Sequence, residues 1–97
     1  MRRLRLTRRA VSDLDEAERR YTQSGSGHLA ARRLEAIKNA IDTLRDHPWI
    51  GRAEAGTGLR RAVRARHVII YTVVQNGDGP GDQELFVLRV LGPGQVN

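Results

Sequence analysis

The chain has 97 residues, of which 39% are hydrophobic and 29% charged, values typical of one compact globular domain. No stretch is apolar enough to cross a membrane, and the basic start MRRLRLTRRA is not followed by the apolar segment of a signal peptide. The absence of cysteine excludes disulfides and thiolate chemistry. We therefore expect a single cytoplasmic domain over residues 1–97, with no membrane association.

The formal net charge is +6, and all of the 17 basic residues except Lys38 are arginine. Two blocks stand out: residues 1–9 hold five arginines and no acidic residue, and residues 52–66 hold five against Glu54 alone. Such blocks bind phosphate groups, bind acidic protein segments, or are merely solvated. Composition alone leaves these three interpretations open.

The N-terminal region predicts a short strand followed by a helix. Residues 2–6, RRLRL, alternate leucine with arginine as a half-buried strand does. Thr7 is suited to cap the helix that comes next. The apolar positions of that helix follow helical spacing and are Ala10, Val11, Leu14, Ala17 and Tyr21.

A second helix is predicted from about His28 to Asp46, with Ser26 as its N-cap and Pro48 ending it. Its apolar stripe consists of Leu29, Leu34, Ile37, Ala40, Ile41 and Leu44, with the stem of Arg33. The Ser24–Gly27 turn joins the two helices into an antiparallel hairpin with one shared apolar face. After the second helix, Trp49 is expected to anchor the loop over the core.

The second half of the chain predicts three strands, Leu59–Arg66, His67–Gln75 and Gln83–Leu91. The sequence NGDGPGD between the last two is typical of a β-hairpin turn. Both of these strands are apolar on both faces. In the last strand, period-two alternation places Leu85, Val87 and Leu91 on one face and Phe86, Leu88 and Val90 on the other.

Strands that are apolar on both faces normally lie in sheets covered on both sides, but the helix hairpin covers one. We therefore expect the second face to be a partner site, unless the twist of the sheet hides part of it. The predicted fold is α+β: an N-terminal strand and a two-helix hairpin packed on a small antiparallel-rich β-sheet. The position of the first strand in the sheet is left open.

Three segments carry a resemblance to a known family. They are LTRRAVSDLDEAERRY, ARRLEAIKNAIDTLRDHPWIGR, and GLRRAVRARHVIIYTVV followed by LFVLRVL. Their order and spacing resemble the ParE-type toxins of the RelE/ParE toxin–antitoxin superfamily over nearly the whole chain. The resemblance implies a bacterial toxin, of the kind linked to plasmid stabilisation, that a ParD-like antitoxin neutralises by wrapping over it. It also implies DNA gyrase as the target, with DNA contacted only indirectly through the antitoxin complex.

The other branch of the superfamily cleaves mRNA on the ribosome, which needs proton-transfer groups around the reacting phosphate. His67 and Tyr71 fall on one strand face but about 13 Å apart, at about 3.3 Å per residue. The nuclease branch has a basic residue where this chain has Val68, and its acid–base groups after the last strand are replaced here by LGPGQVN. The sequence therefore favours a binding toxin without catalytic residues. A nuclease, or a diverged toxin that retains only antitoxin binding and operon autoregulation, is the alternative.

The residues predicted to contact a partner are Arg60, Arg64, Arg66, His67 and Arg89. The arginines could pair with acidic groups on an antitoxin, or be solvated. No metal-ligand spacing and no phosphate-binding glycine loop occurs in the sequence, so no metal or cofactor is expected.

Overall fold

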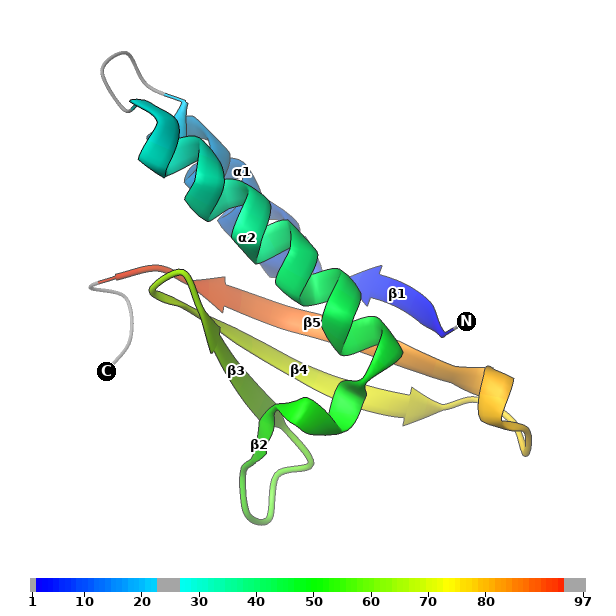
Figure 1. Ribbon diagram of the computed structural model, residues 1–97. Helices are drawn as coiled ribbons and strands as arrows, with labels where there is room; N and C mark the ends of the chain where they lie inside the picture. The colour runs from blue at the N-terminus through cyan, green and yellow to red at the C-terminus, as the bar shows by residue number, and fades with distance from the viewer. Residues whose placement is uncertain (1, 23–26, 94–97) are drawn as a thin grey trace.

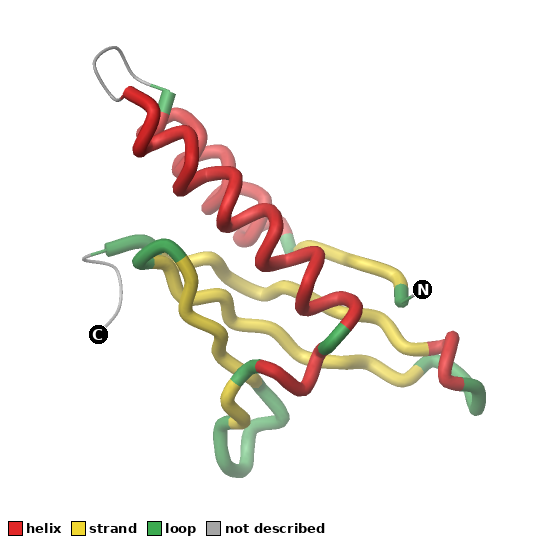
Figure 2. Tube along the Cα trace, in the orientation of Figure 1, coloured by secondary structure: helices red, strands yellow, loops and turns green. Residues whose placement is uncertain are grey.

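The computed structural model describes residues 2–22 and 27–93. In chain order they form β1 (Arg3–Leu6), α1 (Arg8–Tyr21), α2 (Gly27–Asp46), the 3₁₀ turn η1 (Pro48–Ile50), β2 (Arg52–Ala53), β3 (Arg60–Arg64), β4 (His67–Gln75), the 3₁₀ turn η2 (Pro80–Asp82) and β5 (Gln83–Leu91). The two helices lie side by side across one face of a twisted sheet (Figure 1; Figure 2). Within these two ranges, no helix is both long and apolar enough to span a membrane.

The five strands form one sheet in the order β1-β5-β4-β3-β2, in which β1 is parallel to β5 and the other neighbours are antiparallel. This settles the position of the first strand, which pairs with β5. Thr7 then turns the chain from β1 into α1. Its backbone N–H donates to Val87 O at 3.0 Å, and its hydroxyl accepts from Ala10 N at 3.0 Å, so the predicted cap is confirmed.

The core lies between the helix pair and one face of the sheet. Small and aliphatic side chains of α1 and α2 meet the inward-facing residues of β4 and β5. The members of this cluster are Ala10, Ile37, Ile41, Leu44, Ile69, Tyr71, Leu85, Val87 and Val90. Burial of this apolar surface is the main force that holds the helices on the sheet.

A β-bulge in β5 corrects the predicted faces of this strand. Ile70 pairs with Arg89, but its neighbour Tyr71 pairs with Val87, so Leu88 is the extra residue. A bulge shifts side-chain parity by one position. Val90 therefore lies on the helix-facing side with Val87 and is 2% exposed, although strict alternation had placed it on the other face.

Three helix and loop positions predicted to face the core are exposed, so these predictions were wrong. Val11 is 44% exposed because Ala10 and Ala17 occupy the inward side of α1. Leu29 is 63% exposed, near the start of α2, where the helix pair projects beyond the sheet (Figure 1). Trp49 is 61% exposed rather than packed over the core. The predicted Ser26 cap and most of the connecting turn lie outside the described residues.

The strand predicted as Leu59–Arg66 is shorter, because Ala65 and Arg66 form the turn between β3 and β4. Their φ angles are +50° and +64°, the pattern of a two-residue hairpin loop with both central residues left-handed. Arg64 and His67 close the loop as paired residues. A two-residue strand, β2, also forms in the segment that the sequence indicated only as a loop.

The second face of the sheet is less bare than expected. Its apolar side chains, assigned by the strand register, are half-buried, namely Val68, Ile70, Val74, Phe86 and Leu91. Arginine contributes part of this cover, because the guanidinium carbon of Arg5 lies 5.5 Å from the centre of the Phe86 ring. The Nη1 atom of the same guanidinium lies 3.6 Å from Glu84 Oε2 in an ion pair. On this face Val63 is the one strongly exposed large hydrophobic residue of the described ranges, at 72%.

Candidate partner-binding surface

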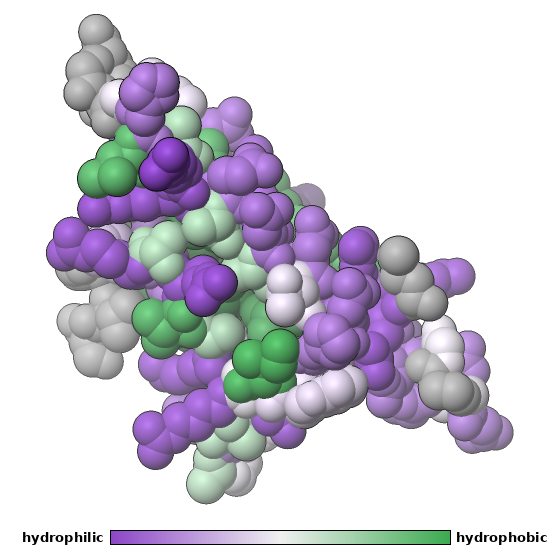
Figure 3. All heavy atoms as spheres, in the orientation of Figure 1, coloured by the Kyte–Doolittle hydropathy of each residue, from purple (hydrophilic) through white to green (hydrophobic). Residues whose placement is uncertain are grey.

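A groove runs between α2 and β3 and has a volume of about 440 Å³. Its floor is made of small and aliphatic side chains, and one cation lies at its border. The lining residues are Ala36, Asn39, Ala40, Thr43, Leu44, Ile50, Ala62, Val63 and Arg64. Figure 3 shows apolar side chains gathering in this part of the molecule, with hydrophilic residues around them. The groove is thus an apolar surface with a polar border.

The groove lies along a strand edge that β2 leaves open. β2 pairs with Arg60 and Arg61 and extends no further along β3. Beyond Arg61, the outer edge of β3 therefore has no strand partner among the described residues. Arg64 lies on the helix-facing side of this open part, and Val63 lies on the other side of the sheet. An open strand edge beside an apolar groove is a typical place for an added segment of another chain.

One end of the groove is formed by η1, which buried polar groups hold in place. The Tyr71 hydroxyl donates to Pro48 O at 2.6 Å and accepts from Gly51 N at 2.9 Å. Burial raises the pKa of Tyr71, although the Gly51 hydrogen bond and nearby Arg60 oppose the shift. The Arg60 guanidinium donates to Gly51 O at 2.8 Å. Because of these bonds, Ile50 is presented on a fixed backbone.

Two of the five residues predicted to contact a partner lie on this surface. Arg64 borders the groove, and Arg66 is exposed in the adjoining β3–β4 turn. Both side chains can reach a partner without any rearrangement of the fold.

The other three residues make contacts within the chain. Arg60 holds η1, as described, and Arg89 forms a hydrogen-bonded ion pair with Asp13 on α1 at 2.9 Å. His67 is 1% exposed and its Nδ1–H donates to Ala65 O at 2.8 Å, with the Tyr21 ring 5.7 Å away edge-on. Nothing in these contacts tests a role in partner binding, which stays a prediction for all five.

Sequence reasoning missed the apolar part of the site. Ile50 and Val63 were not singled out, because an exposed aliphatic side chain in a loop or short strand has no distinctive local pattern. The open edge exists because β2 is only two residues long, and a strand this short has no recognisable sequence pattern.

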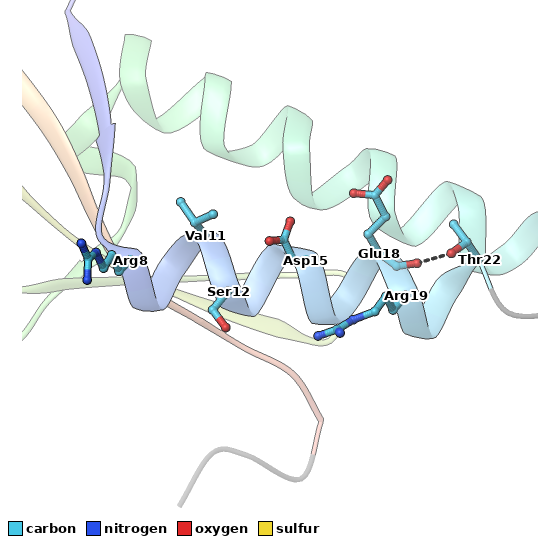
Figure 4. A pocket seen from close by; sticks show the side chains of 7 residues that line it. All are labelled: Arg8, Val11, Ser12, Asp15, Glu18, Arg19 and Thr22. Carbon is cyan, nitrogen blue, oxygen red and sulfur yellow. Dashed lines mark hydrogen bonds between the residues drawn. The ribbon is translucent and has the colours of Figure 1, made fainter.

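A larger but shallower hollow follows the outer side of α1, with a volume of about 690 Å³. Figure 4 shows that its side chains project from one helix, and the hydrogen bond drawn there joins the Thr22 hydroxyl to Glu18 O at 2.6 Å. It carries charges of both signs, and the lining residues are Arg8, Val11, Ser12, Asp15, Glu18, Arg19 and Thr22. Over residues 2–22 and 27–93 no cluster of side chains suited to hold a metal ion occurs.

His67 and Tyr71 do not form an accessible acid–base pair. Both are buried in the core, and each already uses a polar atom in a hydrogen bond to the backbone. General acid–base catalysis requires such groups within about 3 Å of the reacting atoms.

The comparisons with known proteins agree with this architecture. The family model described as "ParE toxin of type II toxin-antitoxin system, parDE" matches residues 4–95. A solved structure, the "Chromosomal ParDE TA system from P. aeruginosa", is similar with a TM-score of 0.68 and 21% identity, over 95% of this chain and 96% of that chain. No curated protein sequence gives a significant match. The fold implied by the resemblance is confirmed, and the chain belongs to the ParE toxin family of type II toxin–antitoxin systems.

Proposed function

We propose that this protein is a toxin that acts by binding and that a ParD-like antitoxin neutralises it through the α2–β3 groove. The single observation that carries the proposal is the apolar groove beside the open edge of β3. Ile50, which lines the groove, is 58% exposed, and Val63, at the open edge of β3, is 72% exposed.

The charge of the chain indicates the chemistry of the antitoxin segment. The net charge is +6, and Arg64 stands at the border of the groove. Complementary charge steers association and disfavours wrong partners. An acidic, amphipathic antitoxin segment fits, with its apolar side in the groove and its carboxylates toward Arg64.

The proposed target is DNA gyrase, which the toxin inhibits by binding to the enzyme; DNA enters only through the antitoxin complex. This rests on the family resemblance and on the lack of an accessible acid–base pair among the described residues. A purified supercoiling assay tests it: the toxin is expected to inhibit supercoiling and to accumulate cleaved DNA. Cleavage of ribosome-bound mRNA would instead support the nuclease function.

Inactivity in both assays would favour a diverged toxin that keeps antitoxin binding and operon autoregulation. The sequence observation behind this second candidate is the LGPGQVN ending, which lacks the basic or histidine-bearing tail implied by the resemblance. Replacing residues 92–97 with the tail of an active relative is expected to restore inhibition if this candidate is right.

The groove is tested with a charge placed on its edge. Ile50→Glu removes an apolar contact in the groove and repels an acidic partner, and it should leave the fold intact because the side chain is 58% exposed. We expect the affinity for the antitoxin encoded beside the toxin gene to fall at least about tenfold. Leu29→Glu, at a 63% exposed position away from the groove, is the matched control. Equal affinities for the two variants would refute the groove as the binding site.

A further inference from the structure

Trp49 is the largest side chain of the protein, yet it is 61% exposed and lies next to Ile50, which is 58% exposed. Both belong to η1, which links α2 to β2. A single exposed aliphatic residue is ordinary in a folded protein, whereas η1 exposes two large apolar side chains, Trp49 and Ile50, which together are called the η1 patch. The fold does not use this patch for its core.

The backbone that carries the patch is unusually well fixed. The Tyr71 hydroxyl donates to Pro48 O at 2.6 Å and accepts from Gly51 N at 2.9 Å. The backbone is therefore held on both sides of Trp49. The Arg60 guanidinium adds a bond to Gly51 O at 2.8 Å. A side chain held on a rigid backbone loses less entropy when it binds, which is a property of residues that dominate interface energies.

One cation, Arg2, lies beside the indole. The guanidinium carbon of Arg2 lies 5.7 Å from the ring centre, and its Nη1 atom donates to Asp46 O at 3.0 Å. The His47 ring stands edge-on at 5.6 Å. The carboxylates of Asp42 and Asp46, near the end of α2, form ion pairs with the Arg45 guanidinium at 3.6 and 4.0 Å.

We propose that Trp49 is a specificity-determining anchor for the antitoxin. The acidic amphipathic segment that fills the α2–β3 groove continues past Ile50, which borders both surfaces. There it places an apolar side chain on the indole and a carboxylate toward Arg2. The occupant follows from this continuity with the groove and from the positive charge of Arg2 beside the ring, and the inference rests on the proposed function.

The test compares Trp49→Ala with Leu29→Ala, because the two wild-type side chains are almost equally exposed. Leu29 lies near the start of α2, whereas Trp49 lies just beyond its C-terminal end. Affinity for the antitoxin encoded beside the toxin gene is measured by titration calorimetry, and folding by thermal unfolding. We expect Trp49→Ala to weaken binding by about tenfold or more without lowering the unfolding midpoint. Leu29→Ala should bind like wild type.

Specificity has its own measurement. The ratio of affinities for the cognate antitoxin and for a ParD-type antitoxin of another system should fall in Trp49→Ala and be largely kept in Trp49→Phe, which preserves an aromatic ring. Wild-type binding with no difference between Trp49→Ala and Leu29→Ala would overturn the anchor alone. No binding by the wild-type protein would overturn the proposed function itself. A Trp49→Ala effect confined to self-association would assign the patch to a second copy of the chain and overturn the proposal.

Discussion

Asp13 of α1 is bound to Arg89 of β5 by two hydrogen bonds, from Nε to Oδ2 at 2.9 Å and from Nη2 to Oδ1 at 3.2 Å. The same carboxylate also accepts the backbone N–H of Val90 at 2.9 Å. β1 ends opposite Val87, so among the described residues this part of the β5 edge has no strand partner, and a side chain of α1 takes its place. The hydrogen bonds that Arg89 donates to Asp13 raise the pKa of Arg89.

Asp13→Ala is expected to destabilise the protein, because it leaves the Val90 N–H without its acceptor in a partly buried position. The loss of that one bond costs about 1–3 kcal/mol. Asp15→Ala, at an exposed position of the same helix, is the control and should be nearly neutral. Urea denaturation of both variants provides the measurement. Equal stabilities would mean that Asp13 does not tie α1 to β5.

Tyr71 is expected to make the fold sensitive to alkaline pH. Its pKa is raised in the folded protein, mainly by burial, so the phenol binds its proton more tightly in the folded state than in the unfolded state. The resulting stabilisation is complete below the unfolded pKa of about 10 and is lost as the pH rises through the folded value. Stability measured from pH 8 to 11 should decline.

The variant Tyr71→Phe separates the hydroxyl from the ring. It cannot ionise, so the part of the alkaline decline due to Tyr71 should disappear. At neutral pH it should be less stable by about 1–3 kcal/mol, because Pro48 O and Gly51 N lose their partner in a buried site. An alkaline decline as steep as that of wild type would show that other groups cause it.

Gly51 is expected to tolerate no side chain. A Cβ atom at this position would collide with the Tyr71 hydroxyl and lie 2.7 Å from the ring carbon Cε1. Its φ of −69° is accessible to any residue, so the constraint is space and not backbone conformation. Gly51→Ala should therefore destabilise η1 and lower the unfolding midpoint, whereas Gly81→Ala, with open space around its Cβ, should not. Equal midpoints would contradict the close approach.

Local patterns predicted most of this fold. Helical spacing located both helices, Thr7 was identified as a cap, and the glycine-rich turn located the last hairpin. The parallel pairing of β1 with β5 joins residues about 80 positions apart, for which no local pattern exists. The Leu88 bulge is equally invisible, because every residue near it is apolar or arginine.

The candidate site was less predictable, since the same side chain serves different purposes in different places. Arg60 and Arg64 read alike in the sequence, yet the first binds the carbonyl of Gly51 and the second borders the groove. Which role an arginine takes depends on whether a backbone acceptor lies within its reach, and that is set by the tertiary fold. The arginines also help to cover the second sheet face, as Arg5 does over Phe86.

The β3–β4 turn offers a way to separate strain from partner contact. Ala65 and Arg66 have φ angles of +50° and +64°, where a residue with a Cβ atom is disfavoured by roughly 1–2 kcal/mol, and asparagine is tolerated better. Ala65→Asn keeps Arg66 and is expected to stabilise the protein by about 1 kcal/mol, seen as a higher midpoint in thermal unfolding. A lower midpoint would mean that the wild-type turn is not strained.

Adding Arg66→Gly to Ala65→Asn creates the Asn-Gly pair favoured in such turns, so stability should rise again. Affinity for the antitoxin should now fall if Arg66 contacts an acidic group, because the guanidinium is lost while the turn is better formed. A surface ion pair is worth about 0–1 kcal/mol, so a loss above about fivefold would indicate a desolvated contact. Opposite changes in stability and affinity are the expected result, since misfolding cannot produce them. Affinity unchanged between the single and double variants would place Arg66 on a solvated face.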